Sequence, residues 1–367
     1  WGRPLRRLST GFWKKGRVLR DREVMSMIER APGIFEVELH SSQLSISEIK
    51  IFIIKGKEGG RSLMVDAGFR NRDCLAVMEG VLEQLGIRYD QLDIFLTHKH
   101  HDHCGLASVY AERGARLFMN RLEDRHCYDC LYYNHSHGAA ENQPQVLQSV
   151  GITQEGTPEV WEMFMEINRR AESEKGWEFD IPGFYYTPAA PGDAFDYGDY
   201  HLRAVPLSGH TYGQLGLYDE EKKLLFIADQ VINGIVPIVG TSYPDEGLLG
   251  KYFKSLEYVK HHYTDCLILP AHNGPVTDLA GTVNRIVFSY LDKTDMIRSI
   301  LVHGHKRMTT REVACLAYGM ERVPADEAQF IKLKMVISKT FSCLEYLCEE
   351  DFVLRTEENG MFFWEAL

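Results

Sequence analysis

The nine residues Thr97-His-Lys-His-His-Asp-His-Cys-Gly105 contain four histidines and one aspartate. They follow Leu92-Asp-Ile-Phe-Leu96, an apolar run that predicts a short buried strand. Histidines two positions apart in an extended segment point to the same side, so His98 and His100 can reach one metal ion. The aspartate and histidine that come next can face a neighbouring ion. The stretch therefore predicts a metal site at the end of a buried strand.

Three further candidate ligands also follow strand-like runs. His210 lies beside a glycine turn, Asp229 follows the five apolar residues 224–228, and His272 follows a similar run. A buried carboxylate is costly unless a cation or another partner neutralises it. Taken singly, each of the three residues is typical of an ordinary loop. Their shared placement after strands is what favours metal ligands.

Around these motifs the hydrophobic pattern alternates between strand-like and helix-like segments. Such alternation predicts an α/β fold. The expected strands cover 34–39, 49–54, 62–65, 92–96, 201–207, 215–218, 224–228 and 266–270, and the expected helices cover 71–86, 248–262 and 279–302.

From about Gly33 to Arg285, the chain resembles the metallo-β-lactamase-fold superfamily, because all five sequence landmarks of that family are present. The third landmark reads Gly209-His-Thr-Tyr212-Gly instead of Gly-His-Thr-Pro-Gly, which alters the loop and keeps the ligand. The resemblance implies an αββα sandwich of two mixed sheets with helices outside. It also implies that His98, His100 and His210 hold one ion, that Asp102, His103 and His272 hold a second, that Asp229 bridges both, and that Asp66 supports the ligand loop without binding metal.

The implied activity is that of a binuclear metal-dependent hydrolase, in which a metal-bridging hydroxide attacks an ester, thioester or lactone carbonyl. Two divalent ions about 3.5–4 Å apart bring the pKa of a shared water toward neutrality. Asp102 and Asp229 would then be the catalytic carboxylates, and Asp229 a candidate proton shuttle. Imidazole and carboxylate ligands suit zinc, which we expect, with iron and manganese as alternatives. Cys104, beside the ligands, is expected to be a small buried residue, and Lys99 and His101 are expected to point away from the ions.

Two other functions stay open. The C-terminal segment resembles that of the lactamase-like endoribonuclease branch, which favours a phosphodiesterase or nuclease. The histidine-rich stretch with a helical insertion instead looks like the quinolone-signal response thioesterase, which favours an acyl-type small-molecule substrate. The other open function is that of a signalling protein with a vestigial metal site.

Composition narrows the class of partner. The 367 residues carry a net charge of -11, yet residues 1–30 hold nine Lys/Arg against three Asp/Glu, which predicts a basic N-terminal arm over 1–32. An acidic body argues against nucleic acid as a partner.

No apolar run approaches the ~20 residues of a membrane span. The eight cysteines are scattered, as in reduced cytoplasmic proteins.

Residues of about 120–200 interrupt the alternation within the predicted metallo-β-lactamase domain at 33–285. A threonine and a proline at Thr157-Pro158 predict a helix start, so we expect a helical insertion. It either packs its own small core or forms a lid over the substrate. Its tyrosines 132, 133, 185 and 186 are candidate hydrogen-bond donors to a leaving group, and Cys127, Cys130, His135 and His137 are a candidate structural zinc site.

The segment 286–367 predicts a separate small α+β module. A helix capped at Thr309, a longer helix near 324–348 and a hairpin around Asn359-Gly360 follow the order of a winged helix. The spacing of the apolar runs suggests a hairpin loop longer than two residues. Residues 281–367 carry 11 Lys/Arg against 13 Asp/Glu, so packing or formation of a homodimer is favoured over DNA binding.

Overall fold

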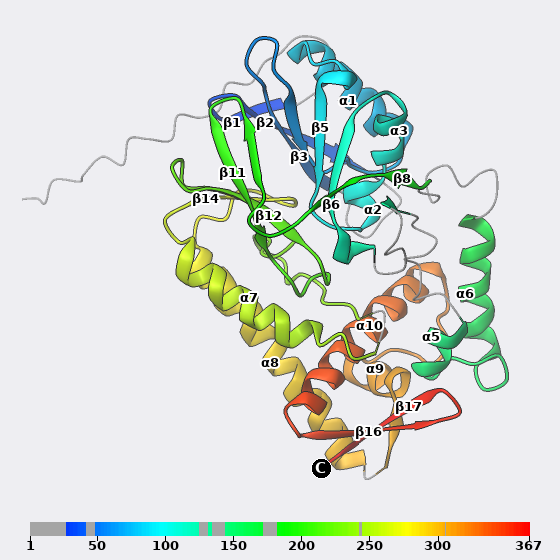
Figure 1. Ribbon diagram of the computed structural model, residues 1–367. Coiled ribbons are helices and arrows are strands. Elements are labelled where there is room, and N and C mark those ends of the chain that lie inside the picture. The colour runs from blue at the N-terminus through cyan, green and yellow to red at the C-terminus, as the bar shows by residue number, and fades with distance from the viewer. Residues whose placement is uncertain are drawn as a thin grey trace, which may run out of the picture.

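The structure is a computed structural model that describes residues 27–41, 48–124, 131–133, 144–171, 182–241, 244–304 and 306–367. Two β-sheets pack face to face, and helices cover their outer faces (Figure 1). The apolar core between the sheets includes Phe52 and Phe95 from one sheet and Phe195 and Phe226 from the other. This arrangement confirms the αββα sandwich that the sequence predicts.

The first sheet has seven strands in the order β1-β2-β3-β4-β5-β6-β9. Strands β4 and β5 are buried along their whole length, because the second sheet covers one face and helices α1 (Arg72–Leu85) and α3 (Ala107–Glu112) cover the other. Helix α1 begins after Asn71, whose side chain accepts a hydrogen bond from the Cys74 amide. The strands are β1 (Met27–Ala31), β2 (Ile34–His40), β3 (Glu48–Ile54), β4 (Ser62–Val65), β5 (Leu92–Leu96), β6 (Arg116–Asn120) and β9 (Thr187–Ala189).

The second sheet has five strands in the order β10-β11-β12-β13-β14. Its outer face packs against helices α7 (Leu248–His262) and α8 (Leu279–Gly304). Strands β13 and β14 are parallel, so their carboxyl ends reach the same edge of the sheet. The strands are β10 (Ala194–Tyr197), β11 (Tyr200–Pro206), β12 (Leu215–Asp219), β13 (Leu224–Ala228) and β14 (Leu267–Pro270).

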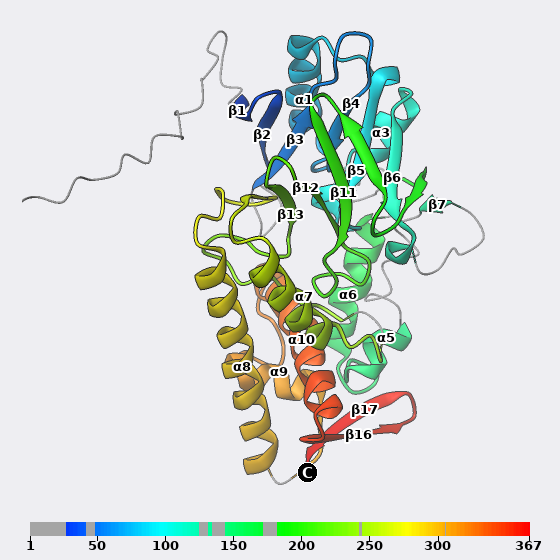
Figure 2. The same ribbon diagram turned by 60° about the vertical axis from the view of Figure 1, so that its left-hand side comes forward.

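The C-terminal segment is winged-helix-like, as predicted (Figure 2). Helix α8 is followed by β15 (Met308–Thr309), α9 (Thr310–Tyr318), α10 (Glu327–Glu349), β16 (Val353–Glu358) and β17 (Met361–Ala366), and the strands pair in the order β15-β17-β16. The hairpin loop is only two residues long, which corrects the longer loop expected from the sequence. Asn359 and Gly360 both have positive φ, at 51° and 75°, as a tight hairpin turn requires.

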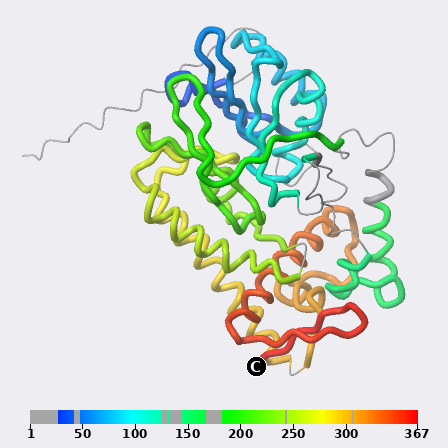
Figure 3. The backbone as a smooth tube through the Cα atoms, viewed as in Figure 1, coloured from blue at the N-terminus to red at the C-terminus, as the bar shows by residue number. Residues whose placement is uncertain are grey.

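The described part of the insertion packs against other elements of the protein. Its described parts are β7 (Tyr132–Tyr133), α5 (Pro144–Ser149), α6 (Pro158–Ala171) and β8 (Phe184–Tyr185). The Phe164 ring of α6 lies 4.6 Å from the Phe330 ring of α10, and the Arg311 amide donates to the Val150 carbonyl at 2.9 Å. Figure 3 shows α5 and α6 beside the C-terminal helices. Because β9 already belongs to the first sheet, the insertion ends before 187, and its lid role stays a prediction.

Strand β1 corrects the predicted extent of the basic arm. Residues 27–31 pair with β2, and the Arg30 guanidinium contacts the Glu36 carboxylate at 2.6 Å. The rest of the arm, and the cluster of Cys127, Cys130, His135 and His137, lie outside the described residues. Helix α8 runs across the predicted boundary at 285/286, and the domain boundaries stay predictions. Within the described ranges, every helix is too short or too polar to span a membrane.

Helix α10 carries a buried carboxyl group, Glu345, whose pKa burial raises to about 7. A carboxyl pKa raised in the folded state favours folding at low pH and loses that contribution as pH rises through 4.5–7. We expect the wild-type protein to lose about 3 kcal/mol of its free energy of unfolding over this pH range. Glu345→Gln should not show this loss. Urea unfolding of wild type and variant at pH 5 and pH 8 measures the difference. The exposed control Glu357→Gln should change in stability between pH 5 and pH 8 as the wild type does. If Glu345→Gln loses as much stability as the wild type over this pH range, the prediction is wrong.

Candidate metal centre

The carboxyl ends of four strands bring the seven predicted ligands together. Strand β5 leads into His98 and His100 and the short helix α2 (His101–Cys104), β11 leads toward His210, β13 ends before Asp229, and β14 leads to His272. The ligand atoms form two groups, and within each group they lie within 4.8 Å of one another. The groups are His98, His100, His210 and Asp229, and Asp102, His103 and His272.

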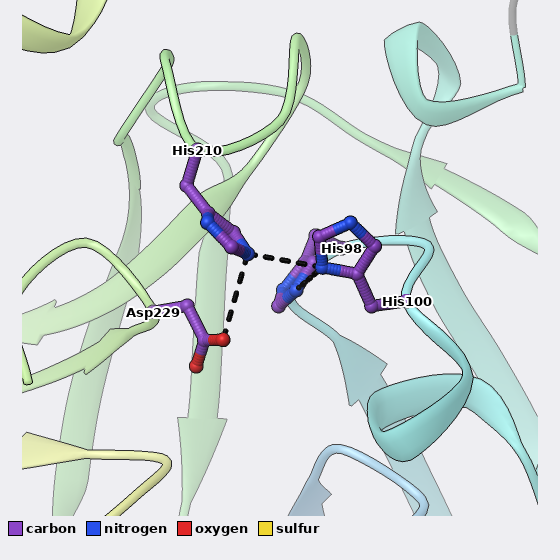
Figure 4. A group of neighbouring side chains, drawn as sticks. All are labelled: His98, His100, His210 and Asp229. Carbon is purple, nitrogen blue, oxygen red and sulfur yellow. Dashed lines mark hydrogen bonds and ion pairs between the residues drawn. The ribbon is translucent and has the colours of Figure 1, made fainter. Parts of the chain in front are cut away.

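The first group is drawn in Figure 4. The Nδ1 atom of His100 lies 2.9 Å from Nε2 of His98 and 3.0 Å from Nε2 of His210. The Oδ2 atom of Asp229 lies 3.5 Å from Nε2 of His210. Ligands about 2.0–2.1 Å from a tetrahedral zinc ion lie about 3.4 Å from one another. The spacing therefore fits one such ion.

Asp229 also faces the second group with its other oxygen. Its Oδ1 atom lies 3.4 Å from Nε2 of His103 and 3.3 Å from Nε2 of His272. Asp102 lies on the same side, with Oδ2 at 3.4 Å from Nε2 of His272 and at 3.7 Å from Nε2 of His103. One carboxylate thus stands between the two groups, as a bridging ligand does.

The outward nitrogens of two histidines are held by main-chain carbonyls. Nδ1 of His210 donates to the Ile238 carbonyl at 2.8 Å, and Nδ1 of His272 donates to the Glu48 carbonyl at 2.6 Å. Because a carbonyl oxygen only accepts, each Nδ1 carries a proton, and Nε2 is the ring nitrogen that points inward and is left to bind a metal. Such outward hydrogen bonds are typical of metal-binding histidines.

Asp66 orients the histidine-rich stretch. Its carboxylate accepts hydrogen bonds from the Thr97 amide at 2.8 Å, the Thr97 hydroxyl at 2.9 Å and Nδ1 of His103 at 2.7 Å. The Thr97 hydroxyl, having donated to Asp66, accepts from Nδ1 of His98 at 3.0 Å. Asp66 itself has φ of 65°, a conformation that non-glycine residues rarely adopt. One carboxylate therefore fixes the inward direction of two rings.

Three inward atoms of the site lack hydrogen-bond partners. Among the described residues, Nε2 of His103, Nε2 of His272 and Oδ1 of Asp229 are buried and have no hydrogen-bond partner. Unpaired buried acceptors are costly, and a cation satisfies several of them at once. The donor set therefore fits divalent metal ions.

The carboxylates attract positive charge strongly. Burial alone would lower the pKa of His272, but the carboxylates of Asp229 and Asp102 raise it to about 10. Burial opposes ionisation of Asp229, yet His272 and His103 hold its pKa well below the usual range. Protons therefore occupy positions at which metal ions would bind, and metal binding is expected to release them.

Two neighbours of the ligands behave as the sequence suggested. Cys104 is fully buried and its thiol donates to the Lys99 carbonyl at 3.1 Å, while burial holds the pKa of the thiol well above its usual value. His101 is exposed. Neither belongs to the two ligand groups.

Glu123, which was not predicted from the sequence, joins two ligand loops. Its side chain is only 4% exposed. Oε2 accepts from the Lys99 amide at 2.9 Å, and Oε1 accepts from the Thr211 hydroxyl and the Gly213 amide, both at 2.7 Å. It thus ties the loop of His98 and His100 to that of His210. The signal was present in the sequence, since Glu123 lies three residues after a strand, much as the ligands do.

Glu123→Gln should weaken both folding and metal binding. In glutamine an NH₂ group replaces one carboxylate oxygen, so it faces a main-chain N–H group that now donates to Glu123. We expect a loss of about 1–3 kcal/mol in stability. Zinc affinity should fall with it, because both loops carry ligands. Chemical unfolding and zinc titration measure the two effects. The exposed Glu257→Gln is the control, and unchanged zinc affinity in Glu123→Gln would contradict the prediction.

A four-layer α/β sandwich with paired His/Asp groups at its strand ends defines a class of metal-binding fold. The sequence model of the metallo-beta-lactamase superfamily matches residues 49–272, more than half of the chain. The chain belongs to the metallo-beta-lactamase superfamily. Members of this superfamily are generally metal-dependent hydrolases. None of the curated proteins matches the sequence.

Two solved structures share the fold over nearly the whole chain. A beta-lactamase domain protein from Burkholderia ambifaria is 18% identical, with a TM-score of 0.74 over 93% of this chain and 94% of its own. A metallo-beta-lactamase family protein from Thermus thermophilus is 20% identical, with a TM-score of 0.68 over 92% of this chain and 99% of its own. With so little of the chain left uncovered, the likeness extends into the C-terminal module.

Proposed function

We propose that this protein is a binuclear metal-dependent hydrolase that acts on an ester, thioester or lactone carbonyl. The observation that carries the proposal is the pair of ligand groups that share Asp229 and direct unpaired acceptor atoms inward. Zinc is the metal we propose, since the ligands are imidazoles and carboxylates in a spacing that suits tetrahedral coordination. A cytoplasmic location stays a prediction from the cysteine pattern.

When bound, the two ions acidify a shared water and polarise the substrate carbonyl. The chain's own residues prepare the site for this chemistry. Main-chain carbonyls and Asp66 bind the Nδ1 atoms of four imidazole rings and direct their Nε2 atoms inward, either directly or through Thr97. Asp229 and Asp102 add negative charge and offer carboxylate oxygens that can take up a proton. Because nearly all these side chains are buried, their electrostatic effects are stronger than in water.

Two observations favour an acyl substrate over a nucleic acid: the net charge of the chain and the placement of helix α10. The acidic chain lacks the excess of basic residues that phosphate backbones require. In DNA-binding winged helices the third helix reads the groove, but here α10 contacts other parts of the protein: its Phe330 ring packs on Phe164 of the insertion, and its Ser342 hydroxyl bonds the Val239 carbonyl. Tyr185, which is 75% exposed, stays a candidate donor to a leaving group.

Metal analysis together with a substrate panel tests the proposal. Purified protein supplied with Zn²⁺ should hold two ions per chain and hydrolyse a p-nitrophenyl ester, an acyl thioester or a γ-lactone in a chelator-sensitive manner. His100→Ala should abolish this activity, whereas His261→Ala, at an exposed histidine, should retain it. Cleavage of bis(p-nitrophenyl) phosphate alone would instead favour the phosphodiesterase. A folded protein that takes up no zinc would overturn the proposal.

A further inference from the structure

Residues 237–241 form an irregular segment that touches the metal centre at one point. The Ile238 carbonyl accepts the hydrogen bond from Nδ1 of His210 and thereby sets the direction of that ring. The segment belongs to no strand. Buried main-chain groups outside regular structure need other partners. Here those partners are side chains of the C-terminal helices.

One hydroxyl of helix α8 holds both sides of Ile238. The Tyr290 hydroxyl donates to the Pro237 carbonyl at 2.7 Å and accepts from the Val239 amide at 2.8 Å. Tyr290 is completely buried, and its ring lies against those of Tyr252 and Phe253. The hydroxyl is therefore in a fixed position, and so are the two peptide groups that flank Ile238.

Helix α10 holds the next residues in the same way. The Ser342 hydroxyl donates to the Val239 carbonyl and accepts from the Thr241 amide, both at 2.9 Å. The Ser338 hydroxyl donates to the Thr241 carbonyl at 3.1 Å. At Gly240 a Cβ atom would lie 2.7 Å from the Ser338 hydroxyl, which shows how closely the helix approaches. Helix α10 thus holds the segment through two serine hydroxyls, those of Ser338 and Ser342.

We propose that the winged-helix-like module is a positioning element of the metal centre, and that Tyr290 and Ser342 act on His210 through the Ile238 carbonyl. The hydroxyls fix the main chain, the main chain fixes the outward hydrogen bond of His210, and that bond fixes the tautomer and direction of its Nε2. This inference rests on the metal centre proposed above. It gives a role to a module that has the element order of a DNA-binding fold and packs against the rest of the protein.

Zinc affinity of Tyr290→Phe tests the inference, because this change removes the hydroxyl and keeps the ring. Loss of a partner that orients a metal-binding histidine typically costs about 10–100-fold in affinity. We expect a loss of that size for one of two Zn²⁺ ions, measured by competition with a chelator, and an altered Co²⁺ absorption spectrum. Tyr200→Phe is the matched control, because the hydroxyl of this buried tyrosine donates to the Pro32 carbonyl at 2.8 Å in another part of the sandwich.

The outcomes separate this inference from the proposed function. Wild-type zinc affinity in Tyr290→Phe would overturn the positioning role and leave the hydrolase intact. Failure of the wild-type protein to bind zinc would overturn both. If Tyr290→Phe does not fold, Ser342→Ala removes a single hydroxyl from the same segment and carries the test. An affinity loss in it supports the role, and wild-type affinity overturns it.

Discussion

Asp229→Asn should reduce the zinc content below two ions per chain and lower kcat/KM at least about 10³-fold, because metal ions contribute several kcal/mol to the reaction. The substitution keeps the shape of the side chain. It removes the negative charge and turns one inward acceptor into an N–H donor. Since Oδ1 faces His103 and His272 while Oδ2 faces His210, either orientation of the amide leaves one group with a donor where it needs a ligand.

Stability provides a second measurement on the same variant. A ligand that binds only the folded state stabilises it by about 4 kcal/mol at a thousandfold excess over its Kd. Wild-type protein should gain such stability from zinc in a thermal unfolding experiment, and Asp229→Asn should gain much less. Asp265→Asn, at an exposed carboxylate beside Lys223, should behave as wild type. Two firmly bound zinc ions in Asp229→Asn would show that the carboxylate does not bridge them.

The candidate ligands could be found in the sequence because each group of them comes soon after a strand. A buried apolar run that ends in His or Asp is a local pattern, and parallel strands such as β13 and β14 bring their carboxyl ends together. The same rule would have found Glu123 after β6. Most strand and helix boundaries agree with the structure for a similar reason, since they depend on periodicity and on caps such as Asn71 and Gly86.

What sequence could not show depends on contacts between distant segments. Ser342 is 103 residues from Val239, and Tyr290 is 51 residues from it, so no local pattern links them. The insertion contacts α10 through Phe164 and Phe330, a pairing that its helical periodicity does not reveal. Strand β1 was missed because five residues of mixed polarity at a sheet edge look like part of the charged arm.

Asp66→Asn should weaken binding of the second ion, although Asp66 is not in either ligand group. The Thr97 amide and hydroxyl both donate to one oxygen of Asp66, so the amide oxygen of asparagine is expected to stay there. The amide N–H₂ then faces Nδ1 of His103, which is itself a donor. His103 can relieve this conflict by moving its proton to Nε2, and a protonated Nε2 does not bind metal.

We therefore expect zinc affinity for the second ion to fall about 10–100-fold, with the first ion retained. Zinc titration measures the stoichiometry, and ¹⁵N NMR of the imidazoles reports whether the proton of His103 has moved. Asp193→Asn is the matched control, because Asp193 also accepts from a main-chain amide, that of Ala190, in an exposed turn. If Asp66→Asn binds two ions as tightly as wild type, then the ring of His103 is held by its packing alone. The carboxylate would then serve only to hold Thr97.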